Sequence, residues 1–220
     1  MIDILQNLDA SLLLWLNSFH NPFWDILMNL ITNKWAWVPM YATILYVLFV
    51  KYGFKITLLF AVSLFLINFA FSDYTCGSII RSFIHRPRPS NADSPICNLV
   101  HIVNNYRGGH YGFPSCHASN SFALATMVYL FFRNRKLTLF IYLWAFVHSY
   151  SRIYLGVHYP ADILVGAIIG SLGATAIYFG FNHFLHFKTK DTFKHINVIW
   201  YAGISIFSIL IVLACLQMYL

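Results

Sequence analysis

Residues 151–162 read Ser-Arg-Ile-Tyr-Leu-Gly-Val-His-Tyr-Pro-Ala-Asp and lie between two apolar runs. Proline suits the first turn of a helix, so a helix is predicted to begin at Pro160, with His158 just before it and Asp162 in its first turn. An aspartate bonded to one imidazole nitrogen leaves the other as an oriented nucleophile or base. Alternatively, His158 is an interfacial histidine and Asp162 a charge favoured by the helix dipole.

Two earlier stretches have the composition of partners for this one. Residues 81–89 read Arg-Ser-Phe-Ile-His-Arg-Pro-Arg-Pro and gather cations where a long apolar run ends. Residues 114–117 read Pro-Ser-Cys-His and add a second histidine where the next apolar run begins. Together, the three stretches predict a phosphate-handling site at a membrane surface.

Phosphate binding needs several donors that converge on its oxygens, and the arginine guanidinium is a planar, permanently charged fork suited to that task. The candidates are Arg81, Arg88 and Arg152. Alternatively, arginines at helix ends extend to lipid headgroups. Arg86 is assigned to that second role, because the flanking prolines fix an extended segment in which residues 86 and 88 share a direction only approximately.

The stretch 114–117 offers both a cap and an anion site. Ser115 is predicted to cap the helix that follows, and exposed amides at a helix start, such as that of Cys116, bind anions. His117 is one residue further along and can give a proton to a leaving oxygen if its ring faces the same pocket. Alternatively, His117 is a buried polar group satisfied by its neighbours.

The composition predicts a membrane protein, because 59% of the 220 residues are hydrophobic and 10% are charged. A bilayer takes about 20 apolar residues per helical span, and continuous rather than alternating apolar runs exclude a barrel. We predict one all-α domain over residues 1–220, with interfacial helices within 4–33. Gly166, Gly170 and Gly173 predict close helix packing. The six predicted transmembrane spans are 35–51, 55–80, 115–132, 137–154, 160–182 and 196–219.

The net charge of +7 does not indicate nucleic-acid binding, because the cations share no soluble face. They fall in loops that alternate along the chain. The loops predicted to be cytoplasmic by the positive-inside rule hold Lys51, Lys55, Arg133, Arg135, Lys136, Lys188, Lys190 and Lys194. The opposite ends of the spans hold Lys34, Arg81, Arg86, Arg88, Arg107 and Arg152. We therefore expect a multi-pass protein of the inner (plasma) membrane whose site faces the exterior.

Residues 90–113 form the longest polar segment, and a loop of this length in a compact domain is usually functional or disordered. It is a candidate lid or headgroup reader. Within it, Arg107 either meets a second phosphate or is a solvated loop arginine. The four cysteines lack CxxC spacing and do not indicate a zinc site. A bridge from Cys97 to Cys76 or Cys116 is open geometrically, but free thiols are the preferred interpretation.

The three stretches resemble the signature motifs of the phosphatidic acid phosphatase type 2 superfamily. These are Arg81 followed after six residues by Arg88-Pro89, then Pro-Ser-Cys-His, then Ser-Arg, five residues, His, three residues and Asp. The resemblance implies metal-free hydrolysis without a cofactor. In it, His158 attacks phosphorus to give a phosphohistidine, Asp162 orients His158, and His117 protonates the leaving group and later activates water. The implied phosphate-binding groups are Arg81, Arg88, Arg152, Ser115 and the amide of Cys116.

The chain departs from the family pattern at two positions. The family usually has lysine where Arg81 stands and glycine where Cys116 stands. Arginine keeps the charge with a different fork, and a side chain at position 116 narrows the approach to phosphate. These departures concern the substrate range more than the chemistry.

We expect the substrates to be lipids, because a pocket at the ends of the membrane-spanning helices is next to the lipid headgroups. Polyprenyl (undecaprenyl) pyrophosphate, lipid A phosphate and phosphatidylglycerophosphate all remain open, and no protein partner is predicted. Two other classes are considered. Vanadium haloperoxidases are similar in these motifs but are usually soluble and larger, and a lipid binder or transporter without turnover has no need of His158 with Asp162.

Overall fold

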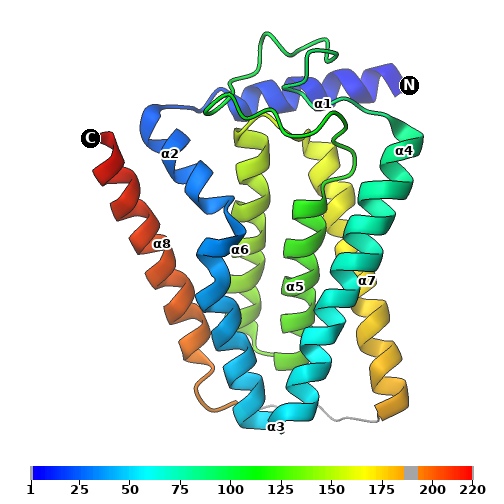
Figure 1. The fold of residues 1–220 in the computed structure, drawn as a ribbon, viewed down its shortest axis with the longest axis vertical. Helices are drawn as coiled ribbons and strands as arrows, with labels where there is room; N and C mark the ends of the chain where they lie inside the picture. The colour runs from blue at the N-terminus through cyan, green and yellow to red at the C-terminus, as the bar shows by residue number, and fades with distance from the viewer. Residues whose placement is uncertain (1, 186–192, 220) are drawn as a thin grey trace.

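The structure is a computed structural model that describes residues 2–185 and 193–219, and in that part of the chain helices are the only extended regular elements (Figure 1). The predicted all-α membrane architecture is confirmed. Three stretches are long and apolar enough to cross a membrane: Lys34–Ile84, Pro160–His183 and Asn197–Met218.

The first of these stretches is a helical hairpin. A short 3-10 turn, η1 (Lys34–Trp37), leads into α3 (Val38–Leu66), and α3 is interrupted at Gly53, where φ is 72° and ψ is −174°. Only glycine adopts such a conformation without strain. The chain reverses there (Figure 1), and its second arm continues through the π-helix η2 (Ile67–Ile80) and α4 (Arg81–Ile84). The two arms correspond to the predicted spans 35–51 and 55–80.

The other four predicted spans also lie on helices. These are α5 (Cys116–Phe132), α6 (Arg135–Tyr154), α7 (Pro160–Leu185) and α8 (Asn197–Met218). However, α5 has 17 residues, most of them buried, and α6 has cations at both ends. Neither is by itself a membrane span by length and composition, so the count of six spans stays a prediction.

The close packing predicted from the glycines is present between α5 and α7. A Cβ at Gly166 would lie 2.3 Å from the carbonyl oxygen of Ser115, and one at Gly170 would lie 2.0 Å from that of Ser119. Both distances are far below contact, so any side chain would push the helices apart. The glycines thus hold the start of α5 against the first turns of α7, where Asp162 stands.

The N-terminal segment forms α1 (Ile2–Asn17) and α2 (Pro22–Ile31), and α1 lies across the upper end of the bundle (Figure 1). An apolar stripe on α1 is exposed, with Ile4, Leu8 and Trp15 each about 60% accessible (63%, 61% and 59%). This is the geometry expected of a helix that lies along a membrane interface.

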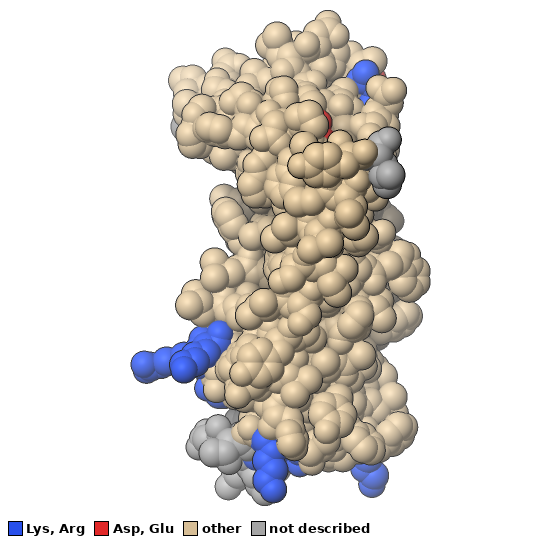
Figure 2. Space-filling view, turned by 90° about the vertical axis from the view of Figure 1, so that its left-hand side faces the viewer, with Lys and Arg blue, Asp and Glu red and all other residues tan. Residues whose placement is uncertain are grey.

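The two predicted groups of cations lie at opposite ends of the bundle. The Gly53 turn, the α5–α6 connection and the segment before α8 all lie at the lower end in Figure 1. Most Lys and Arg atoms in the view of Figure 2 are in its lower half, and the middle of this face has almost none. Lys188 and Lys190 lie outside the described residues.

Candidate active site

The three motif stretches meet at the upper end of the bundle. The end of α4, the start of α5, the end of α6 and the start of α7 all lie there, under the loop 85–115 and beside α1 (Figure 1). The backbone joins two of them directly, because the amide of Ser115 donates to the carbonyl of Asp162 at 3.0 Å. Stretches up to 80 residues apart in the chain therefore form one cluster.

His158 is held at both ring nitrogens. Its Nδ1 lies 3.3 Å from Oδ2 of Asp162, and its Nε2 lies 2.9 Å from a guanidinium nitrogen of Arg88. A guanidinium only donates, so Nε2 is the acceptor and Nδ1 carries the proton toward the carboxylate. Burial, followed by the charges of Arg88, Arg152 and Arg81, lowers the pKa of His158 well below 6.5. The ring is therefore neutral at pH 7, with its lone pair on Nε2.

Asp162 is fully buried and is held by Arg86, which contradicts the prediction that Arg86 extends to headgroups. Oδ1 of Asp162 lies 3.1 Å from Arg86, and Oδ2 accepts the amide of Tyr159 at 3.0 Å. The other end of the guanidinium forms a 2.7 Å ion pair with Asp9 of α1, without the alignment of a hydrogen bond. Arg86 also lies 3.7 Å above the ring of Tyr159. The contacts of Arg86 with Asp162, Asp9 and the ring of Tyr159 draw it inward, so residues 86 and 88 both reach the same motif.

The three predicted phosphate-binding arginines share an unusual feature: each has a buried Nε without a hydrogen-bond partner among the described residues. These are Arg81, Arg88 and Arg152. Buried donors are nearly always paired, so three unpaired donors in one cluster indicate a missing acceptor. Burial, followed by the charges of Arg152 and Arg81, lowers the pKa of Arg88 to about 10. A bound anion would offset the repulsion between these positive charges.

Each arginine is fixed by its other donors. Arg81 donates to the carbonyl of Pro114 at 3.2 Å and lies 3.4 Å from Sγ of Cys116. Arg152, which is 4% exposed, donates to Thr32 at 2.9 Å and to the hydroxyl of Tyr106 at 3.3 Å. The guanidinium planes are therefore positioned before any ligand binds.

Ser115 caps α5 as predicted, its Oγ accepting the amide of Ala118 at 3.4 Å. The amide of Cys116 lies in the first turn of α5, where amides have no intrahelical acceptor. The thiol of Cys116 turns away toward the carbonyl of Ser72 at 3.3 Å and toward Arg81. This position leaves its amide as a candidate for phosphate.

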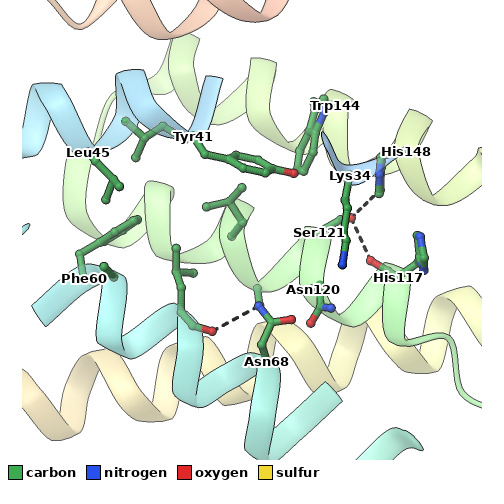
Figure 3. Close-up of a pocket in the computed structure, with 15 residues that line it drawn as sticks. Lys34, Tyr41, Leu45, Phe60, Asn68, His117, Asn120, Ser121, Trp144 and His148 are labelled. Carbon is green, nitrogen blue, oxygen red and sulfur yellow. Dashed lines mark hydrogen bonds between the residues drawn. The ribbon is translucent and has the colours of Figure 1, made fainter. Parts of the chain in front are cut away.

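His117 differs from His158 in its surroundings. No side chain in the described residues hydrogen-bonds to its ring, which stacks on the ring of His148 with centroids 5.6 Å apart. It interacts electrostatically with Arg152, Arg88 and His158. It also lines a cavity of about 370 Å³ between the arms of α3, α5 and α6 (Figure 3).

The loop 90–113 forms the roof of the site. The amide of Arg88 donates to the carbonyl of His110 at 3.1 Å, and that of Gly112 to Arg86 at 3.0 Å. A Cβ at Gly112 would lie 3.1 Å from Oδ2 of Asp162 and 3.1 Å from Cγ of Arg88, so a side chain there would require these neighbours to shift. Burial raises the pKa of the Tyr106 hydroxyl, but the hydrogen bond and charge of Arg152, with the charge of Arg88, outweigh it and lower that pKa overall.

Arg107 has a role within the loop itself. Its guanidinium donates to the carbonyl of Ser90, whose hydroxyl donates to the carbonyl of Arg107 at 3.1 Å. The contact closes the loop on itself and places Arg107 outside the arginine cluster. The thiols of Cys76, Cys97, Cys116 and Cys215 are free, as preferred from the sequence.

Three residues that contact the cluster of motif residues were not predicted to do so from the sequence. Arg86 stands in the repeated Arg-Pro pattern, which could have been recognised as two inward-pointing arginines. Asp9 and Gly112 had no signal of their own, because Asp9 lies on a helix far from the motifs and Gly112 lies in a loop with several glycines.

Comparison with known proteins identifies the family. The family model of the PAP2 superfamily matches residues 57–186 of this chain. A lipid A 4'-phosphatase from Bacteroides thetaiotaomicron is 50% identical over 179 residues, 81% of this chain and 79% of the relative. A lipid A 4'-phosphatase from Porphyromonas gingivalis is 35% identical over 177 residues, which cover 80% of this chain and 74% of the relative.

A solved structure has the same fold. The crystal structure of LpxE from Aquifex aeolicus matches with a TM-score of 0.58 at 24% identity, over 77% of this chain and 93% of that one. At this identity the likeness concerns the fold alone, whereas the family follows from the matched region and the relatives. The chain belongs to the PAP2 superfamily and is a membrane lipid phosphatase.

Proposed function

We propose that this protein hydrolyses a phosphate monoester of an acylated glycolipid of the lipid A type. The reaction proceeds through a phosphohistidine and takes place at the outer face of the inner membrane. The observation that carries the chemistry is the placement of His158 between Asp162 and Arg88, beside three arginines with unpaired buried donors. A protein that only bound lipid would not need an oriented, neutral imidazole.

In the first step, Nε2 of His158 attacks phosphorus while the bond to the lipid oxygen breaks and His117 gives that oxygen a proton. Before this attack, Arg88 exchanges its contact with Nε2 for a phosphoryl oxygen, which frees the lone pair of Nε2. Arg81 and Arg152, with Ser115 and the amide of Cys116, bind the remaining charge as it develops. In the second step, His117 takes a proton from water, and the water oxygen displaces His158 from phosphorus to release phosphate.

Two observations support the substrate and the location. Two relatives that match 81% and 80% of this chain are both named lipid A 4'-phosphatase. The motif end of the bundle is opposite the end that holds Lys51, Lys55, Arg133, Arg135, Lys136 and Lys194, and the positive-inside rule, as applied to the sequence, assigns that second end to the cytoplasm.

Phosphate release by the purified protein in detergent tests the substrate. The panel is lipid A carrying two phosphates, undecaprenyl diphosphate and phosphatidylglycerophosphate, with His158→Ala as the matched control. We expect fastest release from lipid A and loss of one of its phosphates by mass spectrometry. Undecaprenyl diphosphate is the serious competitor, because an undecaprenyl-diphosphatase of Bacillus subtilis is 30% identical over 45% of this chain. Preference for it would replace the proposed substrate.

Thiol labelling tests the orientation. Cys97 is a free thiol in the roof loop, and Cys215 can be removed as Cys215→Ser. An impermeant maleimide should label Cys97 in intact spheroplasts as fully as after lysis. Labelling that required lysis would invert the orientation without affecting the chemistry.

A further inference from the structure

The cavity beside His117 has two chemically different halves. Figure 3 shows Lys34, Asn120 and His117 at one end and Leu45 and Phe60 at the other. Other apolar residues of the lining are Ile44, Leu64 and Leu124. Its volume of about 370 Å³ is that of a ligand site rather than of a single buried water.

Three residues that line this cavity each carry a buried polar atom without a hydrogen-bond partner among the described residues. These atoms are Oδ1 of Asn120, Nε1 of Trp144 and Nε2 of His148. Trp144 is 2% exposed and His148 is 5% exposed, so neither polar atom is satisfied by open solvent. Three such atoms around one space indicate a ligand that supplies their partners.

The hydrogen bonds fix what each atom offers. Ser121 donates its hydroxyl proton to the carbonyl of His117 at 2.9 Å, so the 2.9 Å contact between Ser121 and Nδ1 of His148 needs the proton of Nδ1. Nε2 of the neutral ring is then an acceptor. The unpaired buried atoms of the lining are therefore one donor, from Trp144, and two acceptors, from His148 and Asn120, in addition to the ammonium group of Lys34.

Only some chemical groups match this set. A hydroxyl or a secondary amide supplies both a donor and an acceptor, whereas an ester or an ether only accepts, and a polyprenyl chain does neither. The rings of His117, His148 and Trp144 follow one another with centroid distances of 5.6 and 5.3 Å. The matching group is therefore expected one to two of these ring spacings from His117, in the part of the lipid that follows the phosphate.

We propose that this cavity binds the lipid segment next to the phosphate, and that Asn120, Trp144 and His148 select lipids with a hydroxyl or a secondary amide there. The proposal rests on the lipid phosphatase function proposed above and deepens it. The hydrocarbon that follows this group occupies the apolar half, between the two arms of α3.

Two phosphate monoesters test the selection: ceramide 1-phosphate, which has an amide and a hydroxyl beside its phosphate, and a dialkyl glycerol ether phosphate, which has neither. The wild type should prefer the first in kcat/KM. Asn120→Leu and Trp144→Phe should each lower the ratio of the two kcat/KM values roughly 2- to 10-fold, the usual effect of one lost hydrogen bond. A ratio near one in the wild type, or unchanged in both variants, would overturn the proposal.

Filling the apolar half provides a second test that does not depend on Trp144. Ala61 lines the cavity, whereas its neighbour Val62 is 41% exposed on the outside of the same arm. Ala61→Phe should lower kcat/KM for both lipids but not for p-nitrophenyl phosphate, and Val62→Phe is the matched control. Equal slowing of all three substrates by Ala61→Phe would place the lipid elsewhere.

The same substrates separate this proposal from the proposed function. A wild type that cleaves p-nitrophenyl phosphate but neither lipid would contradict the lipid phosphatase itself. A wild type that cleaves both lipids equally would contradict only the selection. Melting temperatures of the detergent-solubilised variants identify any variant that fails to fold. If Trp144→Phe fails to fold, Asn120→Leu, which changes a half-buried position, is sufficient for the first test.

Discussion

The two histidines of the site have opposite surroundings. His158, in the turn before α7, is 2% exposed and is bonded at both nitrogens, with Arg86 and Asp9 extending the support to α1. His117, at the start of α5, faces a cavity and is bonded by no described side chain. A nucleophile needs one fixed lone pair, whereas an acid that later acts as a base must meet both substrate and water. The difference indicates a rigid side and an accessible side of one site.

The largest effect is expected on the rigid side. His158→Ala should lower phosphate release from every substrate by roughly 10⁴-fold or more, because nothing else can form the bond to phosphorus. Burst kinetics with a radiolabelled lipid phosphate measure this directly, and the acid-labile phosphoenzyme should disappear with the activity. A phosphoenzyme that persisted in His158→Ala would assign the nucleophile to another residue.

On the accessible side, the loss should depend on the substrate. His117→Ala should slow phosphoenzyme formation about 10²- to 10⁴-fold with an alkyl phosphate, whose alkoxide leaving group needs a proton. With an aryl phosphate the leaving phenolate is stable, so the defect in this step should shrink by roughly that range. Rapid quench isolates the first step from water attack, where His117 is needed for both substrates. Equal slowing of the first step would mean that His117 only positions phosphate.

A smaller effect should separate positioning from chemistry. Arg86→Met removes the ion pairs to Asp162 and Asp9 and should lower kcat about 10- to 100-fold, because a misplacement of about 1 Å can cost about 100-fold. In an Asp162→Asn background the same change should cost much less, since the carboxylate that Arg86 holds is gone.

Arg107→Met is the matched control for that cycle, because Arg107 is an arginine of the same end whose contacts lie within the roof loop. It should leave kcat within about twofold, as surface substitutions usually do. Independent, additive losses from Arg86→Met and Asp162→Asn would show that Arg86 acts on folding rather than on His158.

The sequence predicts local elements well because their signals are local. Apolar runs, Pro160 at a helix start and the glycine spacing in α7 all act within a few residues, and the helices lie where they were expected. The number of membrane crossings is a different question. Helix α5 is surrounded by protein, so its burial does not depend on lipid and its composition does not reveal a span.

The site shows the same limit. The spacing of four residues between His158 and Asp162 predicts their contact, whereas Arg88 was predicted only as a phosphate-binding residue. The contact between Arg86 and Asp162 joins residues 76 positions apart, and Asp9 contacts Ala161 across 152 positions. Such pairings arise from how α1 crosses the end of the bundle, which no local pattern encodes. The cavity and its unpaired polar atoms were missed for the same reason.

The last prediction concerns the charge of His158, the proposed nucleophile. The expected effect is the smallest of all, because the resonance of His158 should not change with pH. A histidine with an ordinary pKa near 6.5 gains most of a proton between about pH 7.5 and about pH 5.5. Burial and the neighbouring arginines hold the pKa of His158 well below that value, so its ring should stay neutral over this interval. The ¹³C resonance of its Cε1, assigned by its loss in His158→Ala, should therefore not shift.

The sign of the accompanying stability change follows from the same pKa. Below about pH 6.5 the unfolded chain binds a proton at position 158 that the native protein excludes, so the free energy of unfolding falls as the pH decreases toward the native pKa. Above about pH 6.5 the residue is neutral in both states and contributes nothing. Arg88→Met removes the nearest charge and should raise the pKa of His158, which would bring its titration toward the observable range. A wild-type resonance that titrates near pH 6.5 would show that His158 is more accessible than its contacts indicate, and the contrast with His117 would be lost.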